Sequence, residues 1–309
     1  MSLSSVPPQN GIVHTFGFNL TAFEFTAGGG ELPPNLVLFV AGLGNGLLNV
    51  PYLPQLAQAA SNEFRTSDGG SWGLVQVLLS SSYAGWGTSS LDRDVMQLER
   101  AIKYFRSDIG GNRKKIVLMG HSTGCQDTIK YLIERNHSIH GEIQGAILQA
   151  PVSDREAFKH GREEAQFDKL VQDVYENYIS KGREKELLTE EYRKLSFNTP
   201  ITAYRFYSLA SQRGDDDYFS SYLTSDDYKK SFGNVSKPLL VLYSGSDQFV
   251  PDYVDKQKLI DTWKMSTPDQ YWSSHSKLIQ GGTHDLGVGS SEGVIKDLVD
   301  SVTEFIVSL

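Results

Sequence analysis

The feature that most constrains the fold of this chain is the alternation of short apolar runs with segments of helical spacing. The apolar runs, each short enough for one strand, cover residues 36–41, 74–79, 115–119, 143–148, 238–243 and 276–279. The helical patterns cover residues 52–64, 91–105, 123–135, 253–264 and 294–307. Such alternation is typical of a mostly parallel sheet with helices on both faces. Residues 12–25 alternate in polarity and predict an antiparallel pair before the first parallel strand.

One long segment, residues 154–232, breaks this rhythm. It is rich in charge and has helical spacing without a convincing strand. An insertion of this kind between two sheet strands predicts a helical cap over the carboxyl edge of the sheet; a solvated, partly disordered excursion is the plainer alternative. Tyrosines and phenylalanines are interleaved through the segment, which favours the packed cap. We therefore divide the chain into a core of residues 1–153 and 233–309 and a cap of residues 154–232.

Composition narrows the classes of partner. The chain carries a formal charge of -8, which would be repelled by nucleic acids and by anionic membrane surfaces. Its one cysteine, Cys125, excludes an internal disulfide framework and a cysteine-built zinc site. The N-terminal stretch MSLSSVPPQN lacks the basic and apolar regions of a signal peptide, and no apolar run approaches the length of a membrane span. We therefore expect a soluble, cytoplasmic protein whose partner is a small molecule.

A serine between two glycines follows the apolar run at 115–119. In VLMGHSTGCQD, Ser122 stands between Gly120 and Gly124. The spacing G-x-S-x-G predicts a sharp turn from a strand into a helix, with the serine in a strained backbone conformation. The residues two positions before and two positions after the serine must be glycine, because a side chain at either position would collide with the neighbouring strand or helix. Taken alone, the motif leaves two interpretations about equally open: a nucleophilic serine, or a small polar residue in a structural turn.

Two later loops supply the groups that a serine nucleophile needs. A serine hydroxyl requires a base, usually a histidine that a carboxylate orients. In an α/β-hydrolase these groups follow the serine in the order acid and then histidine, on loops at the carboxyl ends of strands. Asp247 follows the run at 238–243 in SGSDQFVP, and His284 follows the last run in GGTHDL. The sequence thus predicts a triad of Ser122, Asp247 and His284 on an α/β-hydrolase fold.

Other acids and histidines fit these roles less well. Asp252 lies just beyond a proline, where a carboxylate often caps a helix. His275 precedes the last apolar run, at the wrong end of its strand, and Asp285 is too close in sequence to orient the ring of His284. His121 fills the variable position inside the serine turn. The histidines in polar contexts are expected at the surface: His14, His137, His140 and His160.

An oxyanion hole needs two backbone N–H groups aimed at the developing negative charge. Thr123 supplies one, because it follows the serine at the N-terminus of a helix whose dipole favours an anion. Leu43, in the loop AGLGNG after the first parallel strand, is the second expected donor, and Gly42 allows close approach. That loop could instead cradle a pyrophosphate, but the third glycine of the dinucleotide fingerprint would fall at Leu47. No phosphate-binding P-loop and no metal-ligand spacing occur either, so we expect no cofactor and no metal.

The loop motifs together resemble those of one group of enzymes. LSSSYAGWGTSSLD at 79–92 and LFVAGLGNGLL, with the serine turn, SGSDQFVP and GGTHDL, are similar to a fungal family of α/β-hydrolases of uncharacterised function that includes siderophore esterases. The resemblance runs nearly end to end. It implies a serine esterase whose small-molecule substrate is a ferric or iron-free hydroxamate siderophore of the fusarinine type.

The substrate contacts and the exact reaction stay open. Tyr83 and Trp86 lie beside the expected nucleophile, where they would form a substrate wall or pack under the cap. The acyl-enzyme could pass its acyl group to water or to another acceptor. A general carboxylesterase and, less readily, a non-catalytic binding protein also fit the chain. Acidic runs in the cap, such as 214–217, favour a bulky substrate that carries free amines.

Overall fold

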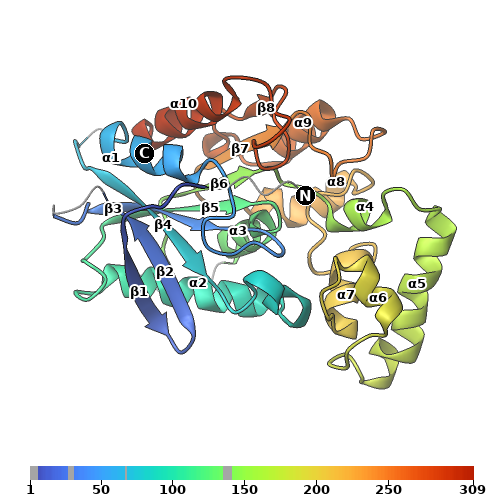
Figure 1. Cartoon of the computed structure of the whole chain (residues 1–309). Helices are drawn as coiled ribbons and strands as arrows, with labels where there is room; N and C mark the ends of the chain where they lie inside the picture. The colour runs from blue at the N-terminus through green and yellow to red at the C-terminus, as the bar shows by residue number, and fades with distance from the viewer. Residues whose placement is uncertain (1–5, 27–30, 67, 135–140) are drawn as a thin grey trace.

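A computed structural model describes residues 6–26, 31–66, 68–134 and 141–309 of the chain. Its centre is an eight-stranded sheet in the order β1-β2-β4-β3-β5-β6-β7-β8 (Figure 1). The strands are β1 (Gly11–Gly17), β2 (Leu20–Phe25), β3 (Asn35–Val40), β4 (Trp72–Leu78), β5 (Lys115–His121), β6 (Gly145–Gln149), β7 (Leu239–Ser244) and β8 (Lys277–Ile279). The pairs β1–β2 and β2–β4 are antiparallel, and the remaining pairs are parallel. The predicted α/β fold, with an antiparallel pair before a parallel sheet, is confirmed.

The helices cover both faces of the sheet and also form an insertion between β6 and β7. Those outside the insertion are α1 (Leu53–Asn62), α2 (Leu91–Arg106), α3 (Gly124–Ile133), α9 (Lys256–Ser266) and α10 (Val294–Val307). Those inside it are α4 (Asp154–Lys159), α5 (Glu164–Asn177), α6 (Glu190–Leu195), α7 (Ala203–Ala210) and α8 (Ser225–Lys230). Short 3-10 helices are η1 (Tyr83–Thr88), η3 (Ile179–Lys181), η4 (Phe232–Asn234) and η5 (Asp269–Tyr271). Within the described ranges, no helix has both the length and the apolar character needed to cross a membrane.

Side chains that alternate along the strands build one apolar cluster on each face of the sheet. In β3, Leu36 and Leu38 belong to the cluster that α2, α3 and α9 cover, while Val37 and Phe39 belong to the cluster under α1 and α10. This alternation follows from the period of two residues along a strand. Because both faces of β3 are buried, its sequence is a continuous apolar run rather than an alternating one.

The insertion contains a lobe with an apolar cluster of its own. Figure 1 shows α5, α6 and α7 together at one side of the sheet. Phe158 of α4, Phe167 of α5 and Phe206 of α7 pack in this cluster, and Trp86 of η1 joins them from the core. Tyr228 of α8 packs instead in the core cluster under α2, α3 and α9. The segment is therefore packed, while its division from the core at residues 154 and 232 and its role as a cap stay predictions.

One predicted surface histidine is buried. His14 of β1 is only 6% exposed, and its ring nitrogens lie 3.0 Å from Glu24 Oε2 and 3.2 Å from Tyr104 OH. The surface prediction for His14 is wrong because α2, which contributes Tyr104, packs over this outer strand. His160 is exposed, and His137 and His140 lie outside the described residues.

Candidate active site

Ser122 lies at the turn from β5 into α3 and has a left-handed backbone angle, with φ of 56°. A Cβ on Gly120 would collide with Gly124 O, and one on Gly124 would collide with Val40 O. Only glycine fits at either position, and a serine at positive φ is strained. The N–H of Ser122 donates to Gln149 O at 3.0 Å, while its side chain is partly exposed. The turn therefore presents the hydroxyl beyond the carboxyl end of β5.

Asp247 and His284 follow the ends of β7 and β8 and lie in direct contact. His284 Nδ1 is 2.6 Å from Asp247 Oδ2, and Asp247 Oδ1 accepts from Phe249 N–H at 3.0 Å. Both side chains are buried, and the Phe249 ring packs edge-on against the imidazole with 4.8 Å between ring centroids. Because the carboxylate holds Nδ1, Nε2 is the ring nitrogen left to accept a proton.

The competing residues have other partners. His275 Nδ1 contacts a carboxylate of α10 at 2.8 Å. Asp285 accepts from a nearby backbone N–H at 2.9 Å, and Asp252 is exposed. The prediction that Asp252 caps a helix is wrong: Asp255 caps α9, because its side chain accepts from the backbone at the start of this helix. None of these groups contacts the ring of His284 in the described residues.

His121 lies between the serine turn and the histidine loop. Its buried ring has its centroid 5.0 Å from that of His284. Burial, with a smaller effect of the neighbouring His284, lowers the pKa of His121 to about 3, so this ring is neutral near pH 7. In the described residues the ring of His284 is hydrogen-bonded to Asp247 and not to Ser122.

A buried glutamine that the sequence analysis overlooked connects these loops. Gln149 ends β6, and its Oε1 lies 2.5 Å from His121 Nδ1 and accepts from Tyr52 OH at 2.9 Å. Its Nε2 donates to Ser244 Oγ at 3.1 Å and to His284 O at 3.4 Å. Gln149 thus ties the serine turn to the end of β7 and to the histidine loop. The sequence feature that could have indicated this role is the position of Gln149, a polar residue at the end of an apolar run.

Two backbone N–H groups beside Ser122 donate to no group in the described part of the chain. They belong to Leu43, in the loop after β3, and to Thr123, in the turn that starts α3. Gly42 lies against the serine, since a Cβ there would come within 2.9 Å of Ser122 Oγ. An oxyanion hole requires free donors of this kind close to the nucleophile. The structure thus brings Gly42 to the serine and, among the residues it describes, gives neither predicted donor a partner.

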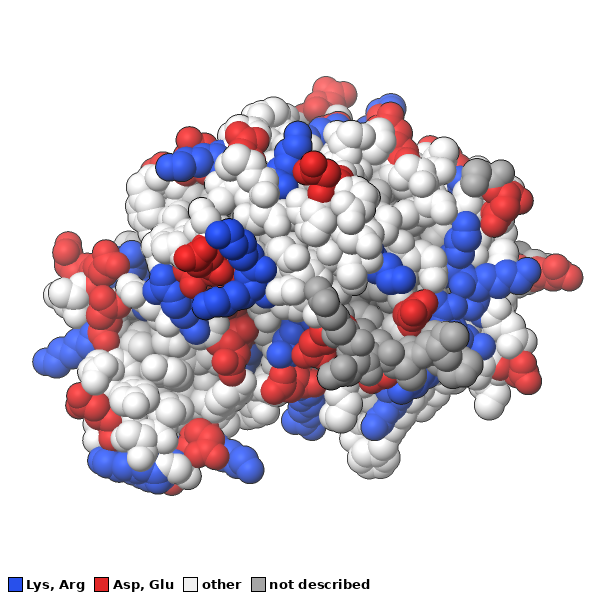
Figure 2. All heavy atoms as spheres, turned by 180° about the vertical axis from the view of Figure 1, so that it is seen from behind, with Lys and Arg blue, Asp and Glu red and all other residues white. Residues whose placement is uncertain are grey.

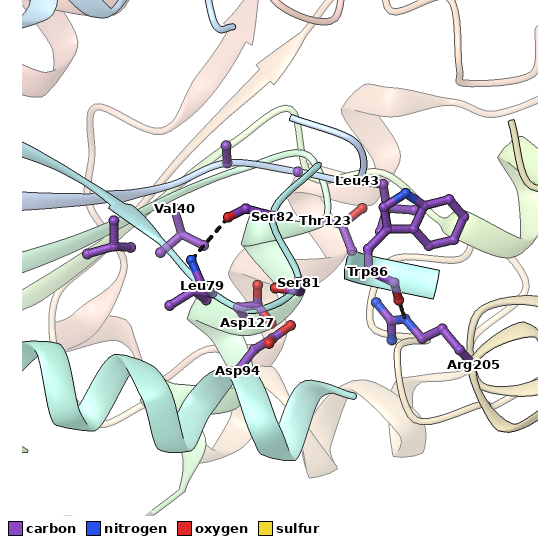
Figure 3. Close-up of a pocket in the computed structure, with 13 residues that line it drawn as sticks. Val40, Leu43, Leu79, Ser81, Ser82, Trp86, Asp94, Thr123, Asp127 and Arg205 are labelled. Atoms are coloured by element: carbon purple, nitrogen blue, oxygen red, sulfur yellow. Dashed lines mark hydrogen bonds between the residues drawn. The ribbon is translucent and has the colours of Figure 1, made fainter. Parts of the chain in front are cut away.

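A small polar cavity lies beside these donors (Figure 3). It measures about 20 Å³, which is room for about one water molecule, and Leu43, Thr123 and Trp86 line part of it. Trp86 is also buried in the lobe's apolar cluster, so its packing under the predicted cap is observed and a substrate contact is untested. Tyr83 does not line this cavity and is 53% exposed.

Several carboxyl groups gather around one arginine at this cavity. Arg205 of α7 donates from Nη1 to both oxygens of Asp216 at 2.7 Å. Burial raises the pKa of Asp94 to about 6 and that of Asp154 to about 8, and it raises the pKa of Asp127 well above its usual range. Asp154 therefore holds a proton near pH 7. Across the described ranges, no group of acidic, histidine or cysteine side chains has an arrangement that could hold a metal ion.

Comparison with known proteins identifies the family. Residues 1–307 match a family model described as "Protein of unknown function (DUF1749)". The chain is 35% identical to Esterase AN6793 of Emericella nidulans, over 98% of this chain and 93% of that protein. It is 33% identical to Fusarinine C esterase sidJ of Aspergillus fumigatus, over 97% of this chain and 96% of that protein. Among solved structures it is similar to the siderophore hydrolase EstB from Aspergillus fumigatus, with a TM-score of 0.79 and 32% identity over 97% of each chain. The chain belongs to the DUF1749 family and has the α/β-hydrolase fold, which confirms the resemblance of its loop motifs.

Proposed function

We propose that this member of the DUF1749 family is a serine hydrolase that cleaves carboxylic esters through an acyl-enzyme. Ser122 is the nucleophile, His284 the base and Asp247 the partner of the base. The observation that carries the proposal is the 2.6 Å contact between His284 Nδ1 and Asp247 Oδ2, in loops that follow β7 and β8 as the strained Ser122 turn follows β5. A carboxylate on Nδ1 fixes the tautomer whose Nε2 accepts the serine proton.

The acylation step uses each group once. Ser122 Oγ attacks the carbonyl carbon of the ester while His284 Nε2 takes the hydroxyl proton. The carbonyl oxygen becomes an oxyanion that accepts from the N–H groups of Leu43 and Thr123, and the N-terminus of α3 favours that charge. Asp247 stabilises the imidazolium, which returns its proton to the alcohol oxygen as the ester C–O bond breaks.

Hydrolysis completes the cycle. Water adds to the carbonyl carbon of the acyl-enzyme while His284 takes one of its protons. The second tetrahedral intermediate then breaks its bond to Ser122 Oγ, and His284 returns the proton to this oxygen as the carboxylic acid leaves. These reaction steps require only the chain, the ester and water.

We propose a hydroxamate siderophore of the fusarinine type, ferric or iron-free, as the substrate. Support comes from two relatives: one is named a Fusarinine C esterase, at 33% identity, and the other a siderophore hydrolase, at 32% identity. Both matches run nearly end to end, so they include the insertion as well as the sheet. The general carboxylesterase is the alternative, and a cytoplasmic location stays a prediction.

The acidic run of the insertion adds no support for a substrate with free amines. Asp215 accepts from Tyr204 OH at 2.7 Å, and Asp216 is paired with Arg205 in the interior. Figure 2 shows basic and acidic side chains mixed over one face of the molecule, without a large region of one sign. These carboxylates already have partners within the chain, so they give no support to recognition of a free amine.

Mass spectrometry of the products tests the substrate proposal. The chain is incubated with fusarinine C, with its triacetyl form and with short p-nitrophenyl esters, and Ser122→Ala serves as the matched control. We expect opened ester bonds in at least one siderophore with the natural chain and none with the variant. Rapid turnover of the short esters with neither siderophore opened would reject the siderophore substrate and favour a general carboxylesterase.

A further inference from the structure

The loop that carries Leu43 is held firmly over its second half. Gly46 N–H donates to Asn49 Oδ1 at 2.6 Å, and Gly46 O accepts from Gln76 Nε2 at 3.0 Å. Leu48 N–H donates to Gln76 Oε1, also at 3.0 Å. These contacts fix residues 46–48 onto β4 while the N–H of Leu43 keeps no partner in the described residues.

Tyr83 holds the same loop at three points. Its N–H donates to Asn45 O at 2.9 Å, and its OH accepts from Leu47 N–H at 3.0 Å. Its ring lies on Gly46, where any Cβ would collide with the ring carbons. Contacts on three consecutive residues leave this part of the loop little freedom to shift.

The backbone of Tyr83 is itself strained. Its φ is 56°, a left-handed angle that is uncommon for a bulky side chain. Strain of this kind persists only where surrounding contacts impose it. The contacts of Tyr83 with the Leu43 loop are surrounding contacts of this kind.

The segment that carries Tyr83 is anchored at its other end. Arg205 Nε donates to Trp86 O at 3.2 Å (Figure 3), and Thr202 N–H donates to Gly87 O at 2.9 Å. Trp86 itself is 2% exposed and packs in the apolar cluster of the lobe. Helix η1 is thus fixed to α7 on one side and to the Leu43 loop on the other, and it can hold Tyr83 in place.

We infer that Tyr83 is a positioning residue that fixes the loop after β3 so that the N–H of Leu43 points at the oxyanion of the ester's tetrahedral intermediate. This inference rests on the proposed function, because it assigns a role within the oxyanion hole. A positioning role differs from a substrate-wall role, because the Tyr83 side chain then contacts the loop and not the ester. The hydroxyl oxygen of Tyr83 already accepts from Leu47 N–H, and the residue does not line the cavity beside Leu43 and Thr123.

The two roles predict different kinetics. A wall residue contributes to binding of the ground state and of the transition state alike, so its loss raises KM. A residue that positions an oxyanion donor acts only where charge develops, so its loss lowers kcat. Removal of one oxyanion donor costs about 10²–10³ in kcat, and a loosened donor should cost less, about tenfold.

The test is Tyr83→Phe, which removes the acceptor for Leu47 N–H and keeps the ring on Gly46. The matched control is Tyr175→Phe in α5, where a half-exposed tyrosine packs beside another ring of the lobe. Turnover of p-nitrophenyl butyrate and inhibition by an alkyl trifluoromethyl ketone are measured, since the ketone forms an oxyanion on the nucleophile. We expect kcat and the affinity for the ketone to fall together by about tenfold, with KM within about twofold and the control unchanged.

Four outcomes would overturn the inference. A rise in KM with kcat and ketone affinity unchanged would make Tyr83 a substrate wall. No change in any of these values would leave it without either role. Turnover that survives in Ser122→Ala would refute the proposed function together with this inference. If Ser122→Ala is inactive and Tyr83→Phe is normal, only the inference fails. Thermal unfolding of both tyrosine variants, with Tyr83→Ala as a stronger disruption, shows whether the loss of kcat follows a loss of folding; if it does, the inference is also refuted.

Discussion

Two polar clusters flank the Ser122 turn, and they differ in how their charges are balanced. The histidine cluster consists of Asp247, His284, His121 and Gln149. The acid cluster consists of Asp94, Asp127, Asp154, Asp216 and Arg205. In the histidine cluster both oxygens of Asp247 accept hydrogen bonds. In the acid cluster Asp127 Oδ1 is buried without a partner in the described residues.

The acid cluster shows how burial can decide the charge state of a carboxyl group. In the acid cluster four carboxyl groups share one guanidinium, so burial outweighs charge pairing and raises the pKa of Asp154 to about 8. Asp154 still reaches the serine turn, because it accepts from Thr123 Oγ1 at 3.3 Å and from Gln126 Nε2 at 2.6 Å. The histidine cluster is the one that we propose for catalysis, while Asp154 of the acid cluster contacts the serine turn and retains a proton near pH 7.

Ser122→Ala should have the largest effect, because it removes the proposed nucleophile and leaves both clusters in place. Loss of the nucleophile in a serine triad costs about 10⁶ in kcat. We expect turnover of p-nitrophenyl butyrate to fall to the background rate, with a circular-dichroism spectrum like that of the natural chain. Retention of more than about a tenth of the activity would eliminate Ser122 as the nucleophile, since the expected loss is far larger.

Asp247→Asn should have the next largest effect, because it breaks the histidine cluster alone. An amide in this place favours the wrong tautomer of His284, and the expected loss in kcat is about 10⁴. Asp252→Asn is the matched control, since Asp252 is exposed on the same loop. An active Asp247→Asn beside an inactive Asp252→Asn would mean that the wrong carboxylate has been assigned.

Asp154→Asn should have the smallest effect on activity and should instead change how stability depends on pH. The pKa of Asp154 is about 8 in the folded chain, against about 3.9 for an unfolded aspartate, so the folded state binds a proton more tightly. Its contribution to the free energy of unfolding is therefore present below pH 4 and is lost as the pH rises toward 8, by at most about 1.4 kcal/mol per pH unit. Asp216 and Asp217 add to the shift, while Arg205 and Thr123 oppose it.

Urea unfolding between pH 5 and pH 8 measures this effect. Asp154→Asn should gain stability relative to the natural chain as the pH rises, because asparagine has no proton to lose. The control Asp261→Asn, at an exposed position of α9, should keep a constant difference from the natural chain. A constant difference for Asp154→Asn as well would contradict a raised pKa of Asp154.

Turnover by the natural chain should rise over the same pH range, whereas the stability contribution of Asp154 falls. The reason is that a histidine base acts only when it is unprotonated.

The sheet and the order of the proposed triad could be predicted because both depend on local sequence. A buried parallel strand gives a continuous apolar run, and Ser122 and Asp247 each follow such a run, while His284 follows the short strand β8. The serine turn could also be predicted from the sequence, because contacts with neighbouring backbone require both of its glycines.

Partners distant in sequence could not be predicted. His14 is buried because a residue 90 positions later covers it, and Arg205 reaches Trp86 O across 119 positions. No motif in the sequence marks the contacts of Gln149 or Tyr83. These contacts form only when loops that are distant in sequence meet at the edge of the sheet. For the same reason the acid run at 214–217 looked like a free charged surface, whereas the fold gives its carboxylates partners.

Covalent labelling with a fluorophosphonate tests the central claim most directly, because this reagent reacts with an activated serine. The natural chain is treated with the probe, digested and mapped by mass spectrometry, beside Ser122→Ala and His284→Ala. We predict a single adduct on the peptide that contains Ser122, no adduct in Ser122→Ala, and strongly reduced labelling in His284→Ala. An adduct on another serine, or no adduct on the natural chain under conditions that label a known serine esterase, would contradict the assignment of Ser122 as the nucleophile.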